Sequence, residues 1–138
     1  MKTSIRIALA ASLFLASAAS FAQAPGISRT EVLTQDVSVP GRHAVVSRVT
    51  VAPRGVLGWH THDGDEISYV ESGDLTLLVA GKPQQVVHAG GAFVVPAGVA
   101  HSVRNDGEAA VALITVHVVA KDKPLATPAA APAAAPAQ

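Results

Sequence analysis

Residues 60–73 of this sequence read HTHDGDEISYVESG, and residues 90–105 read GGAFVVPAGVAHSVRN. Both stretches contain short apolar runs that end at glycine, proline, aspartate or asparagine, the residues that favour tight turns. Neither stretch repeats its apolar residues with the 3.6-residue period of a helix. Together they predict short β-strands joined by turns.

The same pattern extends outward from these two stretches. Short, mostly valine-rich runs separated by glycine-containing turns predict strands at Val45–Val51, Glu66–Val70, Leu75–Ala80, Gln84–His88, Ala92–Val95, His101–Arg104 and Val111–Val119. Many short strands at close, regular spacing are typical of a sandwich, a jelly roll or a barrel. We therefore predict an all-β fold with one domain at residues 40–121, preceded by an N-terminal segment at residues 23–39.

The two ends of the chain are predicted to lie outside this domain. Lys2 and Arg6 precede an apolar stretch, and Ser20-Phe21-Ala22 offers small residues where signal peptidase reads the chain. Residues 1–22 are therefore predicted to be a cleaved signal peptide, too short for a membrane span, of an exported protein that is periplasmic or secreted. Residues 122–138 are mostly alanine and proline, and they predict a disordered or polyproline-like tail.

Composition narrows the classes of partner. Ten basic and ten acidic residues balance, and lysine and arginine do not cluster, so nucleic-acid binding is not expected. The chain has no cysteine, so disulfides cannot stabilise it; a hydrophobic core must do so, with or without a contribution from bound metal. The predicted mature chain is short for its apolar content and the edges of its sheets need covering, so we expect a homodimer.

The candidate chemistry lies in histidines. His60 and His62 are two residues apart, a spacing that points both imidazoles to one face of a strand. Asp63-Gly64 predicts a turn that brings Glu66 back beside them, and His101 follows a second turn far along the chain. Taken singly, each of these residues is more simply explained as a solvated or hydrogen-bonded side chain. Their joint placement predicts one metal site.

These spacings resemble the two sequence motifs of the cupins. The first cupin motif is glycine, five residues, HxH, three or four residues, glutamate, six residues and glycine, and this sequence matches it with His60, His62, Glu66 and Gly73. The second is glycine, five residues, PxG, two residues, histidine, three residues and asparagine, matched by Gly90, Pro96, Gly98, His101 and Asn105. One position departs from the pattern: Arg54 stands where the first glycine is expected, and Gly55 follows it.

The resemblance covers roughly residues 40–120 and implies a double-stranded β-helix, or jelly-roll, barrel. It also implies a metal held by His60, His62, Glu66 and His101. Three imidazoles and a carboxylate suit Mn, Fe, Co, Ni, Cu or Zn as a divalent ion. Three functions stay open: a small-molecule dioxygenase or isomerase, a non-catalytic exported module that binds a small ligand or metal, and a domain that the metal only stabilises.

Residues next to the motifs carry weaker expectations. Trp59 alternates with His60 and is expected to point away from the metal. Asp63 and Asp65 are expected to serve the turn, with a role as hydrogen-bond partners of the imidazoles as the alternative. The remaining histidines are expected to be exposed or hydrogen-bonded outside the site, although one of them could carry protons: His43, His88 and His117.

Overall fold

The structure is a computed structural model that describes residues 24–133. The predicted signal peptide, residues 1–22, lies outside the described residues. The described part consists of strands and connecting turns: β1 (Ile27–Asp36), β2 (Arg42–Val51), β3 (Val56–Thr61), β4 (Gly64–Ser72), β5 (Asp74–Val79), β6 (Gln85–His88), β7 (Ala92–Val95), β8 (His101–Arg104), β9 (Val111–Ala120) and β10 (Thr127–Pro128). Among residues 24–133 no helix has the length and apolarity to cross a membrane.

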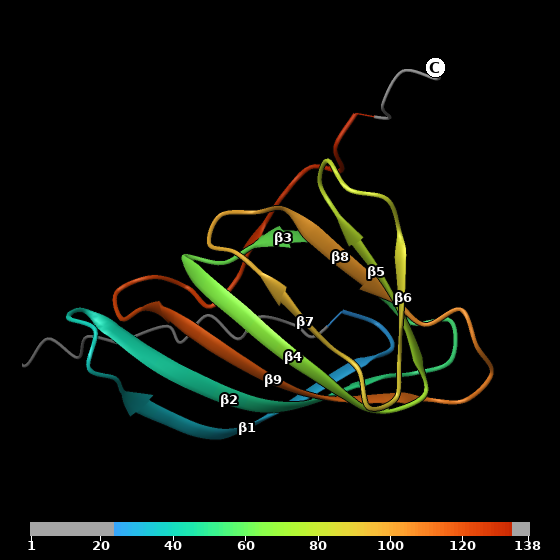
Figure 1. The fold of residues 1–138 in the computed structure, drawn as a ribbon, viewed down its shortest axis with the longest axis horizontal. Helices are drawn as coiled ribbons and strands as arrows, with labels where there is room; N and C mark the ends of the chain where they lie inside the picture. The colour runs from blue at the N-terminus through green and yellow to red at the C-terminus, as the bar shows by residue number, and fades with distance from the viewer. Residues whose placement is uncertain (1–23, 134–138) are drawn as a thin grey trace, which may run out of the picture.

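The strands form two five-stranded antiparallel sheets. The first sheet has the order β1-β2-β9-β4-β7 and the second has the order β10-β3-β8-β5-β6. Figure 1 shows the first sheet in the lower part of the molecule and the second sheet above it. Apart from the consecutive pairs β1-β2 and β5-β6, neighbours within each sheet come from distant parts of the chain, so each sheet interleaves early and late strands. This arrangement confirms the predicted all-β jelly-roll fold.

Strict alternation of buried and exposed residues shapes the interior. Along β9, every second residue from Val111 to Val119 is buried, and the residues between them face outward. Valine and leucine supply most of the core, as expected for a chain with few aromatic residues: Val49, Val51, Val70, Leu75, Leu77, Val87, Phe93, Val95, Val103, Val111 and Leu113. Full burial of one such side chain contributes roughly 1.5–3 kcal/mol.

The register of the first sheet places polar side chains in the middle of its buried face. His117 on β9 pairs with Glu66 on β4. Two residues away along the same strands, Thr115 pairs with Ser68. On the other side of β9, Thr115 pairs with Ser47 of β2. All five side chains are buried. Buried polar groups usually serve a hydrogen-bond network or a functional site.

The structure describes ordered segments at both ends of the predicted domain. The segment at residues 23–39 contains the long strand β1, which pairs with β2. The expected disordered tail at residues 122–138 begins with order, because β10 pairs with β3 and the Ala129 N–H donates to the Trp59 carbonyl oxygen at 2.9 Å. Backbone pairing does not depend on side-chain type, and proline is tolerated at a sheet edge because its missing N–H is not needed there.

Arg54, which replaces the first glycine of the motif, has a φ of 62°. It is the one non-glycine residue with positive φ in the part of the chain that the structure describes. Glycine is the usual residue in this backbone region because it has no Cβ. The turn before β3 therefore keeps the backbone conformation that suits glycine although the residue has changed.

Candidate metal centre

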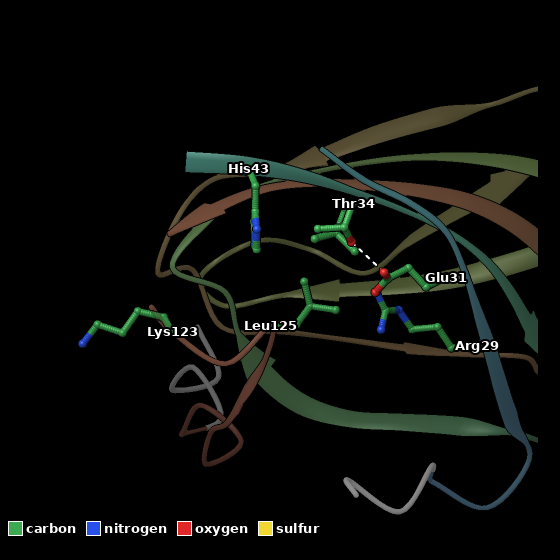
Figure 2. A pocket seen from close by; sticks show the side chains of 7 residues that line it. Arg29, Glu31, Thr34, His43, Lys123 and Leu125 are labelled. Atoms are coloured by element: carbon green, nitrogen blue, oxygen red, sulfur yellow. Dashed lines mark hydrogen bonds between the residues drawn. The ribbon is translucent and has the colours of Figure 1, made fainter. Parts of the chain in front are cut away.

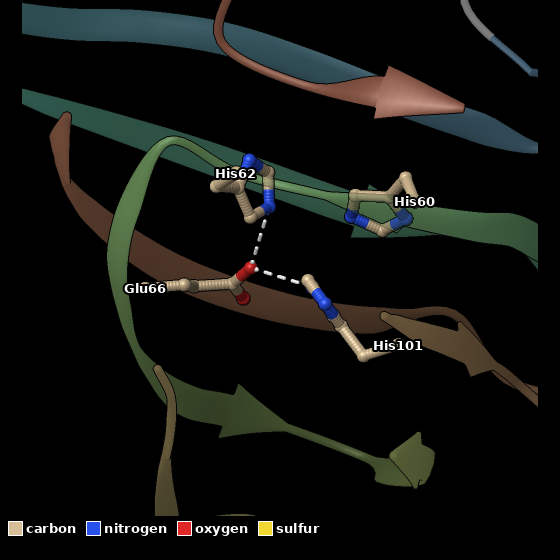
Figure 3. Close-up of side chains that lie close together, drawn as sticks. All are labelled: His60, His62, Glu66 and His101. Carbon is tan, nitrogen blue, oxygen red and sulfur yellow. Dashed lines mark hydrogen bonds and ion pairs between the residues drawn. The ribbon is translucent and has the colours of Figure 1, made fainter. Parts of the chain in front are cut away.

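His60, His62, Glu66 and His101 meet inside the barrel. Their candidate ligand atoms all lie within 4.8 Å of one another, and all four side chains are buried. Figure 3 shows the four side chains pointing toward one another, with the Glu66 carboxylate between His62 and His101. The sequence-based expectation that these four residues form one cluster agrees with this geometry.

The local backbone explains how the cluster assembles. β3 ends at Thr61, β4 begins at Gly64, and the reversal between them returns Glu66 toward His62. At Gly64 a Cβ atom would lie 1.9 Å from the carbonyl oxygen of Val118, so only glycine lets β4 approach β9 this closely. His101 opens β8 and pairs directly with His60 across the sheet.

Hydrogen bonds to backbone carbonyl groups fix the three imidazoles. The Nδ1–H of His60 donates to the Gly58 oxygen at 2.7 Å, and that of His101 donates to the Val99 oxygen at 3.0 Å. His62 donates in the same way to the carbonyl oxygen of Leu125. A carbonyl oxygen only accepts, so Nδ1 must carry the proton in each ring. In each neutral ring Nε2 then holds the lone pair.

These tautomers fit a bound cation. The Nε2 atoms of His62 and His101 both lie 3.0 Å from Oε2 of Glu66. A lone pair and a carboxylate oxygen at this distance repel each other unless a proton or a metal ion lies between them. Three nitrogen donors and one carboxylate, without a thiolate, match the ligand preference of first-row divalent transition metals. The cluster is thus positioned to bind a metal.

Burial and charge set the protonation of the cluster. Burial lowers the pKa of His60 to about 4, so this ring is neutral at physiological pH and available as a donor. Burial works to raise the pKa of Glu66, but its interactions with the neighbouring imidazoles, His101 first, hold it well below its usual range. Burial works to lower the pKa of His101, but its contact with Glu66, the charge of Glu66 and the Val99 carbonyl together outweigh this and raise it. Glu66 is therefore the anion of the site.

Ser68 fixes the second oxygen of Glu66. Its hydroxyl donates to Oε1 at 2.7 Å, and both side chains are buried. Oε1 is thereby turned away from the imidazoles, and Oε2 faces them. This support orients the carboxylate in the way that hydrogen-bonded partners orient metal ligands in proteins.

His117 lies beside the cluster, contrary to the expectation that it sits outside the site. Its Nε2 is 3.4 Å from Oε2 of Glu66, and its ring centroid is 4.3 Å from that of His62. Burial lowers the pKa of His117, which favours the neutral ring. His117 is not one of the four grouped ligands. A signal was present in the sequence, since His117 falls on the inward face of the alternating strand at residues 111–119.

The other residues for which the sequence left a role at the site open do not contact the imidazoles of the cluster. The partners of the imidazole Nδ1–H groups are all carbonyl oxygens, so the alternative role of Asp63 and Asp65 is wrong. Asp65 accepts instead from the N–H of Ala97, at 3.0 Å, and links β4 to the turn between β7 and β8. His88 is exposed and pairs with Asp74 at 2.8 Å, away from the site as expected.

A cavity of about 500 Å³ opens onto the cluster. Its wall includes His60, His62, Glu66, His101 and His117, and most of the remaining wall is apolar. Trp59 also lines the cavity, although its alternation with His60 predicted that it points away from the metal. β3 has an irregular register between Leu57 and His60, which breaks the alternation on which that expectation rested.

A smaller cavity of about 290 Å³ adjoins the first and shares Arg29 and Leu125 with it. His43 lines this second cavity, on the side of β1 and β2 (Figure 2). His43 is absent from the lining of the larger cavity, in line with its expected place outside the metal cluster.

Comparison with known proteins relates this chain to a family and to solved structures. The family model described as a cupin domain matches residues 47–117, just over half of the chain. A solved oxalate oxidase in complex with the substrate analogue glycolate is 28% identical, with a TM-score of 0.57, over 69% of this chain and 52% of its own. This chain thus spans about half the length of that enzyme. Among curated proteins, none matches this chain in sequence.

Two further solved structures share the fold at lower identity. A predicted oxalate decarboxylase from Thermotoga maritima is 22% identical, with a TM-score of 0.59, and the match covers 67% of this chain and 80% of that one. A cupin superfamily protein from Desulfitobacterium hafniense is 12% identical, with a TM-score of 0.58, and the match covers 71% and 82%. At these identities the likeness concerns the fold alone.

Proposed function

Since this chain belongs to the cupin family, we propose that it binds one divalent transition metal and acts on a small molecule held beside that metal. The ligands in this proposal are His60, His62, Glu66 and His101. The carrying observation is that these four side chains converge on the wall of a cavity of about 500 Å³, a size typical of small-molecule sites. A metal that only stabilised the barrel would not need such a space.

The chain's own residues would divide the work. The four ligands would hold the ion, and a metal with open positions polarises a bound oxygen or carbonyl group of a substrate. His117, buried beside Glu66, is within reach of a molecule in the cavity and could hold or pass a proton. The apolar wall would exclude water from the reacting molecule. Oxidation with dioxygen and isomerisation both use such a site, and the oxalate oxidase neighbour supports oxidation.

Elemental analysis of the purified full chain tests the metal part of this proposal. We expect close to one divalent transition metal per chain, lost after replacement of His101 by alanine. Oxygen uptake and product analysis with the loaded protein, over a panel of small hydroxy and keto acids, then test turnover. A wild-type chain that retains no divalent metal contradicts the proposal, and loaded protein without turnover reduces it to a binding module.

We also propose that the protein is exported and acts in the periplasm or after secretion. β1 begins at Ile27, beyond the predicted cleavage point at Ala22, so cleavage would leave every described strand intact. N-terminal sequencing of the native protein should give Gln23 as the first residue. A mature chain that starts at Met1 in the cytoplasmic fraction contradicts export.

We further propose that two copies pair through the outward face of the first sheet. One apolar residue from each of its five strands forms a continuous row: Leu33, Val46, Val116, Ile67 and Val94. Three of these side chains are exposed, which leaves an apolar surface in contact with water. A second copy carries the same row, so two faces related by a two-fold axis would cover each other.

A further inference from the structure

Arg29 is the feature of the cavity that the metal site does not use. It lies on β1, and its side chain lines both the larger and the smaller cavity. Figure 2 shows its guanidinium next to the Glu31 carboxylate, on the side that faces Leu125. Among the described residues that line the larger cavity, Arg29 is the one with a permanent positive charge.

The placement of this charge is costly. Desolvation by burial lowers the pKa of Arg29, and attraction to the Glu31 carboxylate offsets part of this effect. The same charge is felt deeper in the barrel, where it contributes to the lowered pKa of His117. A guanidinium has five N–H donors, so Arg29 can hold a further carboxylate beside the groups already near it.

Two polar side chains share this wall with Arg29. The Thr115 hydroxyl and the Nδ1 atom of His117 are buried, and neither has a hydrogen-bond partner within residues 24–133. Both line the cavity, on the same face of β9. Buried polar atoms without a partner carry a free-energy cost that a ligand or an ordered water removes.

The register gives the order of these groups along the cavity. Arg29 pairs with Val49, and Val49 pairs with Leu113 of β9. Along β9, Thr115 and then His117 follow Leu113 at intervals of two residues, roughly 6.6 Å each. These pairings order the backbone only: the Arg29 side chain reaches Leu125 and the smaller cavity, so its guanidinium lies to one side of the wall that carries Thr115 and His117. The opposite side is apolar and includes Leu57, Phe93 and Val103.

We propose that the cavity binds a small carboxylic acid with an apolar body, whose carboxylate is held by the Arg29 guanidinium and the Thr115 hydroxyl. The other end of the acid then lies against the metal ligands, and the apolar side chains contact its body. This inference rests on the proposed function for the reaction, but it concerns a different group of the protein. A guanidinium fork matches the geometry of a carboxylate and distinguishes it from a neutral isostere.

Trp59 makes a direct test available, because it is the single tryptophan of the chain and lines the cavity. The full chain is titrated with hexanoate and with hexanamide, with tryptophan fluorescence as the readout. Both the metal-loaded and the chelator-treated protein are used, and the metal content of each sample is measured. We expect hexanoate to bind at least about tenfold more tightly than hexanamide in both forms, since charge-assisted hydrogen bonds are the stronger ones.

Variants of Arg29 test whether this residue causes the preference for hexanoate over hexanamide. Arg29→Gln should weaken hexanoate binding about tenfold or more and leave hexanamide binding unchanged, and Arg29→Lys should fall between. The matched control is Arg48→Gln, on the neighbouring strand, where the guanidinium is exposed and lies 3.6 Å from Glu71. This control should bind hexanoate as the wild type does.

Three results would overturn the proposal: equal binding of acid and amide, wild-type hexanoate affinity in Arg29→Gln, or hexanoate binding confined to the metal-loaded form. The last result would mean that the carboxylate coordinates the metal instead of Arg29. Failure of the metal proposal is separately visible as missing metal in the wild type, and the chelator-treated samples still test Arg29 in that case.

Discussion

The imidazole of His62 donates its Nδ1–H to the carbonyl oxygen of Leu125, 63 residues further along the chain. Leu125 precedes β10, which pairs with β3 beside the metal cluster. The C-terminal segment therefore holds one of the four candidate ligands in place. Composition predicts that removal of residues 126–138 changes neither stability nor metal content, and the pairing of β10 with β3 gives a reason to test this prediction.

Truncation tests this coupling. A chain that ends before Pro124 loses the carbonyl acceptor of His62 and β10, so metal affinity should fall by roughly 10–100-fold, as for other hydrogen-bonded partners of metal ligands. The melting temperature should also fall. A chain that ends after Ala130 keeps both features and serves as the control. Equal metal affinity in the two truncated chains would show that the Leu125 contact does not orient His62.

Replacement of the ligands tests the metal assignment. His60→Ala, His62→Ala or His101→Ala should each weaken metal retention by more than about 100-fold, since each removes a bond and the geometry that it fixed. Glu66→Gln should weaken it too, because the only anionic donor is lost at constant size. Elemental analysis after dialysis against a weak chelator provides the measurement.

The controls for these variants are His43→Ala and His88→Ala, whose side chains lie outside the cluster. The wild type should also melt at a higher temperature with metal than after chelation, by an amount that grows with the logarithm of free metal concentration. Loss of metal in a control variant, with retention in His101→Ala, would refute the ligand assignment.

His117→Ala should give an intermediate result. His117 contacts Glu66 Oε2 at 3.4 Å but is not one of the grouped ligands, so its removal loosens the carboxylate without removing a bond to the ion. We expect roughly tenfold weaker metal binding, less than in the ligand variants. Isothermal titration with Zn²⁺ or Co²⁺ measures the difference. A loss as large as in His101→Ala would make His117 a fifth ligand.

Gly64→Ala should disrupt the site from the backbone. Its Cβ would overlap the Val118 carbonyl oxygen, so β4 and β9 must separate, which costs at least about 1–3 kcal/mol of unfolding free energy. Glu66 would move with β4, and metal affinity should fall as well. The matched control is Gly58→Ala, where no atom lies within 4 Å of the added Cβ. Chemical denaturation of both variants measures the two costs.

Charge on the outer face of the first sheet should separate the proposed dimer. Val94→Lys places an ammonium group in the apolar row, whereas Val86→Lys makes the same change on the edge strand of the second sheet. Both valines are exposed, so neither variant should lose core packing. Sedimentation should find monomer for Val94→Lys and dimer for Val86→Lys. A monomeric wild type at micromolar concentration contradicts the proposal.

Spacing in the sequence was enough to predict the ligand cluster. The offsets from His60 to His62 and Glu66 are local, and a two-residue interval has only one geometric meaning on a regular strand. His101 could be added because the resemblance to a family supplied the long-range pairing. His117 escaped prediction because its neighbour, Glu66, is set by the register between β4 and β9, and a single sequence does not specify register.

Local irregularity caused the remaining errors. Alternation predicted that Trp59 faces away from His60, but the register of β3 is irregular between Leu57 and His60, and both residues line the cavity. Strand β10 was not predicted, because the alanine- and proline-rich composition describes side chains, whereas an edge strand needs only backbone hydrogen bonds. At Arg54 the sequence departs from the motif, but the structure does not: the backbone keeps the positive φ of the glycine that Arg54 replaces.

β9 is the last long strand of the chain, yet it occupies the centre of the first sheet, between β2 and β4. The sheet therefore cannot close during synthesis until nearly the whole chain has been made. Closing such long loops is slow, and folds dominated by distant pairings take milliseconds to seconds. Under the export proposed above, this delay would keep the chain unfolded for the crossing. The metal cluster would then assemble only after the crossing, and the ion would come from the compartment in which the protein folds.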